Sequence, residues 1–306
     1  MSRLVHSRRG FHRSMQISKS ELFTFVEGKS ADRYFYGRLC RSVCKPKGVI
    51  YEQVIGNQVP PGSSGGKEVL IGFFKYLRKK RALVDSFKGK TTRALFFLDK
   101  DIDDLSRAMA RSPHLIYTEF YQVENYLFRF GNLVDAAASA ASLDAAVLEV
   151  SLGDQLNWLN TRAANWQQWV TLCVFAKTRK IPGQANYGIA SPLNTPPNSP
   201  TDALAYTARL AGVQTASGMP AERFNRAFKR TSRKVNQLFD DGQYDKIFKG
   251  KWYALILAHD IKAIVGTQEY DERFVQQKLF GNLPLTLSYD ADWSNYFRAR
   301  ILGVLP

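Results

Sequence analysis

A short apolar segment that runs directly into a cluster of acids most constrains the fold of this chain. Residues 93–104 read RALFFLDKDIDD, and their acids are Asp99, Asp101, Asp103 and Asp104. An uninterrupted apolar run such as 94–98 is typical of a strand buried on both faces of a parallel sheet. Open α/β sheets bind their ligands at the carboxyl ends of such strands. We therefore expect these acids at the ligand-binding edge of an α/β domain.

The spacing of the first two acids is compatible with a metal site. Asp99 and Asp101 are two residues apart, so their side chains leave the same face if the backbone stays extended, and both can then bind one hard cation. A solvated acidic turn that ends the strand and starts the next helix explains the same residues equally well. The local sequence leaves both interpretations open.

The charge balance indicates a polyanionic partner. Lys and Arg number 43 against 27 acids, which gives a formal net charge of +16 and a pI near 9.8. Such an excess favours nucleic acid. A membrane surface is the competing polyanion, but no apolar run approaches the roughly 18–20 residues of a spanning helix, so we expect no membrane partner.

Cysteine, histidine and glycine patterns argue against several other kinds of site. The three cysteines form neither an even disulfide set nor a CxxC pair, and predict reduced thiols in a cytoplasmic protein. The four histidines lack zinc-site spacing, and no GxSxG nucleophile motif is present. The glycines of residues 57–67 have the wrong spacing for a P-loop, and Glu68 replaces its Ser or Thr. We expect only a flexible, substrate-facing loop there.

The pattern along the chain predicts three regions. Residues 1–20 carry five bases and no acid and are expected to form a flexible basic arm. Residues 21–134 alternate apolar strands with helical segments, which predicts a mostly parallel sheet flanked by helices. Residues 135–306 are expected to be largely α-helical, with a proline-rich segment at 182–200 that is either a long loop or an interdomain segment.

Two basic clusters are candidates for binding nucleic acid. The first, at the end of a predicted helix, includes Lys79, Lys80 and Arg81. The second is one face of an amphipathic helix expected over 220–239, and includes Arg226, Lys229, Arg230 and Arg233. Phosphate contacts would explain both clusters, and so would ordinary solvated helix faces.

An earlier strand completes a family pattern. Residues 21–27, ELFTFVE, form an apolar strand that ends in Glu27, and Gly28 follows it. This Glu-Gly turn, together with the DKD sequence at 99–101, resembles the Toprim domain of topoisomerases, primases and old-type nucleases. Two further segments, YTEFYQVENYLF with Glu124 and FKGKWY with Lys251, resemble motifs of Toprim nucleases from bacterial phage-defence systems such as PARIS.

The resemblance implies a Toprim-like α/β fold and a metal-dependent nuclease. Nucleases of this family are encoded beside ABC-type or AAA-type ATPases, so it also implies an ATPase partner that holds the enzyme inactive until phage proteins are sensed. The expected substrate is RNA such as tRNA, cleaved by a toxic effector of abortive infection. A DNA endonuclease of the old-type class and a non-catalytic subunit that binds nucleic acid or an ATPase are the alternatives. The sequence does not decide whether the chain forms a homodimer.

The resemblance also assigns roles to individual residues. Asp99 and Asp101 would bind Mg²⁺ or Mn²⁺ through their carboxylate oxygens. One or two such ions supply positive charge and a reactive nucleophile in phosphodiester cleavage. Asp103 and Glu124 are candidate additional ligands. Glu27 would be a ligand or the general base.

Three further assignments concern the surroundings of this site. Lys251 would stabilise negative charge on the phosphate, and the segment 248–265 would thereby return to the active site. Asp32 and Asp104 are expected only as acids near helix N-termini, where the helix dipole favours them. Ser30 is expected to cap the first of these helices.

Overall fold

The chain divides into two units. The computed structural model describes residues 7–28, 31–60, 65–106, 109–266 and 271–305. Unit 1 comprises Met1–Asp99, Ala110–Thr118 and Ser288–Pro306, and unit 2 comprises Lys100–Met109 and Glu119–Leu287. This division differs from the boundary expected at residue 134, because residues 119–134 belong to unit 2 and the C-terminal residues belong to unit 1. Ser30, the expected helix cap, lies outside the described residues.

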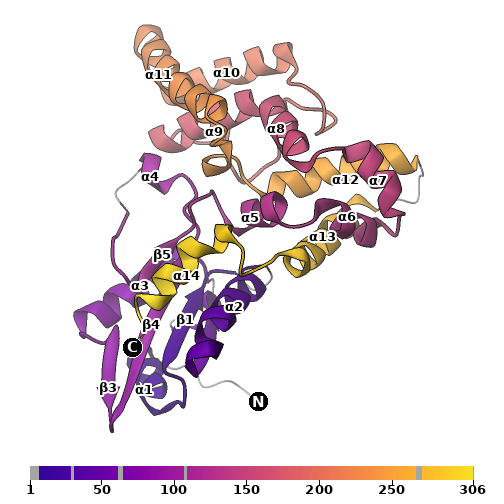
Figure 1. The fold of residues 1–306 in the computed structure, drawn as a ribbon. Helices are drawn as coiled ribbons and strands as arrows, with labels where there is room; N and C mark the ends of the chain where they lie inside the picture. The colour runs from indigo at the N-terminus through magenta and orange to yellow at the C-terminus, as the bar shows by residue number, and fades with distance from the viewer. Residues whose placement is uncertain (1–6, 29–30, 61–64, 107–108, 267–270, 306) are drawn as a thin grey trace. The chain divides into compact units, whose positions relative to one another are not determined.

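Unit 1 is built on a five-stranded, mostly parallel sheet (Figure 1). The strands are β1 (Leu22–Val26), β2 (Tyr51–Ile55), β3 (Val84–Phe87), β4 (Lys90–Leu98) and β5 (Leu115–Tyr117). Their order is β2-β1-β4-β3, and β5 also pairs with β4. The pairs β1–β2, β1–β4 and β4–β5 are parallel, whereas β3 and β4 form an antiparallel hairpin. The expectation of a mostly parallel α/β sheet is confirmed.

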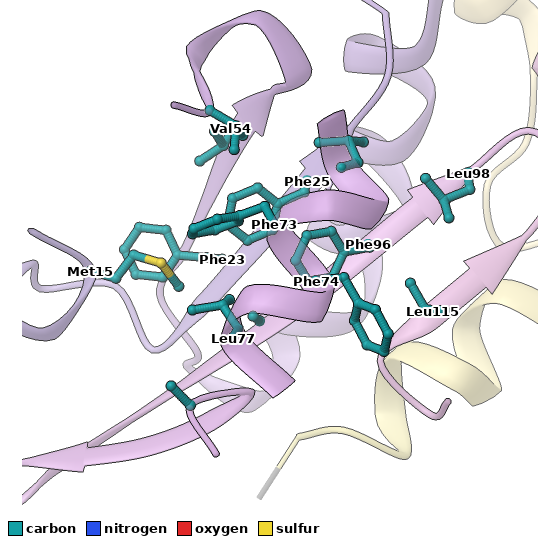
Figure 2. Packing of buried hydrophobic residues seen from close by; sticks show 14 residues of the cluster. Met15, Phe23, Phe25, Val54, Phe73, Phe74, Leu77, Phe96, Leu98 and Leu115 are labelled. Carbon is teal, nitrogen blue, oxygen red and sulfur yellow. The ribbon is translucent and has the colours of Figure 1, made fainter. Parts of the chain in front are cut away.

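Helices cover both faces of this sheet, which explains why β4 is apolar without alternation. On one face Phe96 stacks on Phe25 with ring centroids 4.5 Å apart and meets Phe73 and Phe74 of α3 (Lys67–Lys79), as Figure 2 shows. On the other face Phe97 stacks at 4.3 Å on a tyrosine of α2 (Ala31–Cys44). Full burial of each such ring contributes roughly 1.5–3 kcal/mol. α14 (Asn295–Leu302) also contacts α2.

The N-terminal segment is a packed helix where a flexible arm was expected. α1 (Arg8–Ile17) begins after Ser7, whose hydroxyl accepts a hydrogen bond from the Gly10 N–H. Phe11 and Met15 lie four residues apart and therefore share a face. Phe11 packs edge-on against Phe73 at 5.6 Å, and Met15 is buried. The basic composition of residues 1–20 concealed this short apolar face.

Unit 2 is helical in its described residues. Its helices are α4 (Asp103–Ser106), α5 (Val123–Phe130), α6 (Leu133–Ala141), α7 (Ala145–Leu152), α8 (Gln155–Asn165), α9 (Gln167–Arg179), α10 (Ala203–Ser217), α11 (Ala221–Asp240), α12 (Lys251–Val265) and α13 (Glu272–Thr286). The expectation of a largely helical C-terminal part is confirmed. Within the described ranges, no helix is both long and apolar enough to cross a bilayer.

Residues 182–200 form an ordered loop within unit 2. They contain no helix or strand. The Trp166 indole N–H donates to the Pro197 carbonyl at 2.7 Å, and the Asn194 side chain donates to the Asn165 carbonyl at 2.9 Å. Because these contacts all lie in unit 2, the segment is a loop and not a connection between units.

Candidate functional site

Glu27 and Asp99 are brought together at the carboxyl edge of the sheet. They directly follow β1 and β4, which are neighbouring parallel strands with Phe25 opposite Phe96. The Asp99 N–H donates to Glu27 Oε1 at 2.9 Å. Both side chains are partly buried. The structure therefore places the Glu27 carboxylate against the backbone of Asp99, at the ends of two neighbouring parallel strands.

The turn after Glu27 depends on glycine. The Gly28 N–H donates to Asp32 Oδ2 at 2.7 Å, and a Cβ added to Gly28 would lie 2.7 Å from the same oxygen. Such a distance is too short for a carbon and an oxygen that are not bonded. Asp32 lies in the first turn of α2, where its charge also meets the positive end of the helix dipole. The expectation for Asp32 is confirmed, with the added role of holding this turn.

Asp101 does not continue the extended backbone of the strand. Its φ is 53°, in the left-handed region, and its N–H donates to the Tyr121 carbonyl at 2.7 Å. The extended backbone on which a shared face for Asp99 and Asp101 would depend is therefore not present. Aspartate tolerates this conformation better than most residues because its short polar side chain can bond locally. Asp101 belongs to unit 2 and Asp99 to unit 1.

The next two acids start a short helix. Asp103 and Asp104 both occupy the first turn of α4. Asp103 is 6% exposed, and its N–H donates to the Lys100 carbonyl at 3.1 Å. Asp104 pairs with the Lys100 ammonium at 3.1 Å. The expectation that Asp104 is a helix N-terminal acid is confirmed, while the metal-binding role of Asp103 stays a prediction.

Unit 2 brings together the segments that contain Glu124 and Lys251. Gly250 packs against the start of α5, where a Cβ on Gly250 would lie 2.5 Å from the Asn125 backbone nitrogen and 2.7 Å from the Glu124 carbonyl carbon. The Lys251 ammonium lies 3.4 Å from Glu124 Oε1. The Glu124 side chain is 7% exposed, whereas that of Lys251 is 55% exposed. Lys251 is therefore a solvent-accessible cation held by a buried carboxylate.

Lys249 is a neighbour that the sequence reasoning missed. Its ammonium donates to the Tyr187 carbonyl at 2.7 Å. Burial and the adjacent charge of Lys251 lower the pKa of Lys249, and the carboxylates of Glu124 and Asp101 partly offset this effect. The alternation of lysines in FKGKW was the available signal, because it sets Lys249 and Lys251 on either side of the tightly packed glycine.

A buried polar network supports this part of unit 2. The Asn125 side chain donates to Asp245 Oδ1 at 3.0 Å and to the Phe248 carbonyl at 2.9 Å. Arg129 Nη1 lies 2.8 Å from Asp245 Oδ2. Asp245 is 1% exposed, and burial raises its pKa, partly offset by Asn125 and Arg129. This network fixes α5 relative to the segment that leads into Lys249.

The two predicted basic clusters are exposed. Lys79 ends α3 and is followed by Lys80 and Arg81. In α11, Phe224 and Phe228 pack on Phe175 of α9 at 5.2 and 5.3 Å. The opposite face of α11 presents Arg226, Lys229, Arg230 and Arg233 to solvent. The amphipathic helix is confirmed, whereas its contact with nucleic acid stays a prediction.

The arrangement of acids bears on the kind of metal site. Over the part of the chain that the structure describes, no three His, Cys, Asp or Glu side chains form a metal-ligand group. Glu27 and Asp99 each carry a carboxylate at neighbouring strand ends, and Mg²⁺ keeps several waters and commonly uses only one or two protein carboxylates. Comparisons of the chain with models of known families, with curated proteins and with solved structures find no match.

Proposed function

We propose that this chain is a metal-dependent nuclease of the Toprim class that cleaves RNA. The observation that carries the proposal is the hydrogen bond between the Asp99 N–H and Glu27 Oε1 at the carboxyl ends of neighbouring parallel strands. Acids at this edge of an α/β sheet stand where such folds bind ligands. The strongly basic composition favours a nucleic-acid substrate.

The carboxylates of Glu27 and Asp99 would hold Mg²⁺ or Mn²⁺. Both are hard oxygen donors, and Asp101, two residues further along the chain, stays a predicted ligand, as do Asp103 and Glu124. A bound ion would supply positive charge to the scissile phosphate and a water molecule with a lowered pKa.

The protein's own groups would orient the reaction. The Asp99 N–H holds one oxygen of Glu27, and the bond between Gly28 and Asp32 holds the turn beyond it. The Glu27 carboxylate is thereby fixed either as a ligand or as the base that takes a proton from the attacking oxygen. As the new phosphorus–oxygen bond forms, the leaving oxygen departs with its electron pair and gains a proton from solvent.

In unit 2, Lys251 would contact a phosphate of the RNA. Its side chain is accessible, and Glu124 limits its position by the 3.4 Å ion pair. A cation whose position is already fixed stabilises developing charge better than one that must be ordered during the reaction. Lys249 is less suited to this contact, because its ammonium already donates to the Tyr187 carbonyl.

Purified protein incubated with total RNA and with plasmid DNA, each with Mg²⁺ and with EDTA, tests the proposal. We expect Mg²⁺-dependent cleavage of RNA that Asp99→Ala abolishes. Asp104→Asn, which removes a nearby acid outside the proposed site, should cleave normally. Undiminished cleavage by Asp99→Ala would refute the site, and cleavage of DNA instead of RNA would identify an old-type DNA endonuclease.

The exposed basic face of α11 favours a second candidate, a non-catalytic subunit that binds nucleic acid. Charge reversal at Arg226 and Arg230 should weaken binding and make its salt dependence shallower by about 1.4 in the log–log slope for two lost single-strand contacts. If this variant loses binding while the wild type shows no cleavage under any metal condition, the second candidate is supported and the nuclease is refuted.

The family resemblance also leads us to propose an ABC-type or AAA-type ATPase partner that restrains toxicity. Expression of the chain alone should arrest bacterial growth, and expression of Asp99→Ala should not. If an ABC-type or AAA-type ATPase is encoded beside the chain, its co-expression should relieve the arrest, and the two proteins should co-purify. Growth arrest that persists in Asp99→Ala would contradict a toxicity based on cleavage.

A further inference from the structure

A basic groove on unit 1 lies along α2 and the edge strand β2. It is open to solvent and has a volume of about 340 Å³. Its lining residues are Arg33, Tyr34, Gly37, Arg38, Arg41, Tyr51 and Gln53. This lining contains three guanidinium groups and two phenol rings and no acid. It shares no residue with either basic cluster identified from the sequence.

The charges of the groove are available to a ligand. Arg33, Arg38 and Arg41 are exposed, and among the described residues none of the three forms an ion pair. Arg33 and Arg41 are eight residues apart, which corresponds to about 12 Å along the helix axis. Guanidinium groups bind phosphate oxygens in a planar, two-bond geometry. The three arginines therefore span enough of the helix to contact several phosphates of one polymer and not only a single ion.

Aromatic rings stand beside these charges. The Arg38 guanidinium lies 6.0 Å from the ring centre of Tyr34 and 5.7 Å from that of Tyr289. Tyr289 is buried, whereas Tyr34 is 38% exposed and keeps an accessible ring. An accessible aromatic ring next to arginines is the arrangement on which unpaired bases stack while their phosphates are bound.

The floor of the groove is shaped by α2 and β2 together. Tyr51 donates from its hydroxyl to the Gly37 carbonyl at 2.9 Å. A Cβ on Gly37 would lie 3.4 Å from Gln53 Oε1. Because Gly37 has no side chain, the groove stays open between α2 and Gln53. Among the described residues, the buried Nε2 of Gln53 has no hydrogen-bond partner. Glu52 points to the other face of β2, where it accepts from Ser18 and Ser20.

We propose that this groove binds a single-stranded segment of nucleic acid, with Arg38 and Arg41 on phosphates and a base on Tyr34. The inference deepens the proposed nuclease function, on which it rests for the identity of the substrate. α2 begins just after the turn that carries Glu27 and Gly28. The groove therefore begins near the N-terminus of α2, a few residues after Glu27 in the chain.

Fluorescence anisotropy with a short labelled single-stranded RNA in EDTA tests the groove without cleavage. Arg38→Glu/Arg41→Glu should weaken binding at least tenfold and reduce the salt slope by about 1.4. The control Arg9→Glu/Lys19→Glu makes the same charge change at exposed residues of unit 1 outside the groove and should have a much smaller effect. An equal loss of RNA affinity in the two variants would show that the groove contributes only non-specific charge, and would overturn the proposal.

A pair of variants at Tyr34 tests the aromatic contact. Tyr34→Ala should lose about tenfold in affinity for single-stranded RNA and little for a duplex, whereas Tyr34→Phe should bind like the wild type. Thermal unfolding and circular dichroism of each variant show whether the fold is retained. A loss in Tyr34→Phe equal to that in Tyr34→Ala, or displacement of RNA by polyglutamate as readily as by unlabelled RNA, would refute base stacking.

The two proposals fail in different ways. If the wild type cleaves no nucleic acid with Mg²⁺ but Arg38→Glu/Arg41→Glu loses binding, the nuclease proposal is refuted and the groove stands. If Glu27→Gln abolishes cleavage while Arg38→Glu/Arg41→Glu binds and cleaves like the wild type, the site stands and the groove is refuted.

Discussion

Glu27 has two separable contributions, one to stability and one to chemistry, and two substitutions distinguish them. Glu27→Gln retains an oxygen that can accept from the Asp99 N–H but removes the charge that metal binding or proton transfer needs. Glu27→Ala removes both. Loss of the acceptor leaves the Asp99 N–H without this bond and costs about 1–3 kcal/mol, whereas the glutamine should cost less than about 1 kcal/mol. Loss of a general base lowers the rate by about 10²–10⁴-fold.

The assay compares the cleavage rate of labelled RNA under saturating Mg²⁺ with urea unfolding of the same preparations. Both Glu27 variants should be inactive, but only Glu27→Ala should lose measurable stability, and Asp104→Asn should resemble the wild type in both measurements. Full activity in Glu27→Gln, together with instability and inactivity in Glu27→Ala, would show that Glu27 only holds the strand ends together. That result would refute the catalytic reasoning.

The remaining predictions concern packing, buried charge and pH. Gly250→Ala should lower the free energy of urea unfolding by about 1–3 kcal/mol, because the new Cβ meets the α5 backbone. Gly281→Ala should raise it by about 0.5–1 kcal/mol, because no atom lies within 4 Å of the new Cβ. Arg129→Met should cost about 3 kcal/mol by leaving Asp245 buried without its cation, and Arg129→Met/Asp245→Asn should recover part of this loss. Burial raises the pKa of Cys44 from 9.0 to about 11, so the unfolded thiol ionises first and the free energy of unfolding should fall as pH rises from 9 to 11. In Cys44→Ala the free energy of unfolding should fall less steeply with pH than in the wild type, by at most about 1.4 kcal/mol per pH unit. An equal fall in the two proteins would contradict the raised pKa of Cys44.

The sequence predicted those parts of the fold that depend on local pattern and strand pairing. The apolar run around Phe96 and Phe97 indicated a strand buried on both faces, because each face must meet another layer. The resemblance to Toprim domains paired Glu27 with Asp99, and both residues follow apolar segments that indicated strands. The helix around Phe224 followed from its apolar periodicity.

Features set by distant partners could not be predicted in this way. Arg129 and Asp245 are 116 residues apart in the chain, and neither lies in a recognisable motif. The short helix around Phe11 and Met15 is held by a core formed from other segments, so its own composition gave only a weak signal. Partial burial lowers the pKa of Lys249, and its position in the sequence does not reveal that burial.

The backbone of each acid in the DKD sequence is likewise held by a distant partner. The Asp99 N–H is bound by the side chain of Glu27, and the Asp101 N–H by the carbonyl of Tyr121. Residue spacing alone treated these acids as equivalent, but only Asp99 is held beside Glu27 within unit 1. Asp99→Asn is therefore the substitution that separates a metal site from a solvated acidic turn.

This separation has a readout that does not depend on cleavage. A ligand that binds only the folded state raises its stability, by about 2.7 kcal/mol at a concentration one hundred times the dissociation constant. Saturating Mg²⁺ should therefore raise the melting temperature of the wild type and of Asp104→Asn but not that of Asp99→Asn. An equal rise in all three proteins would mean that Mg²⁺ acts elsewhere and that the acids after β4 only end the strand.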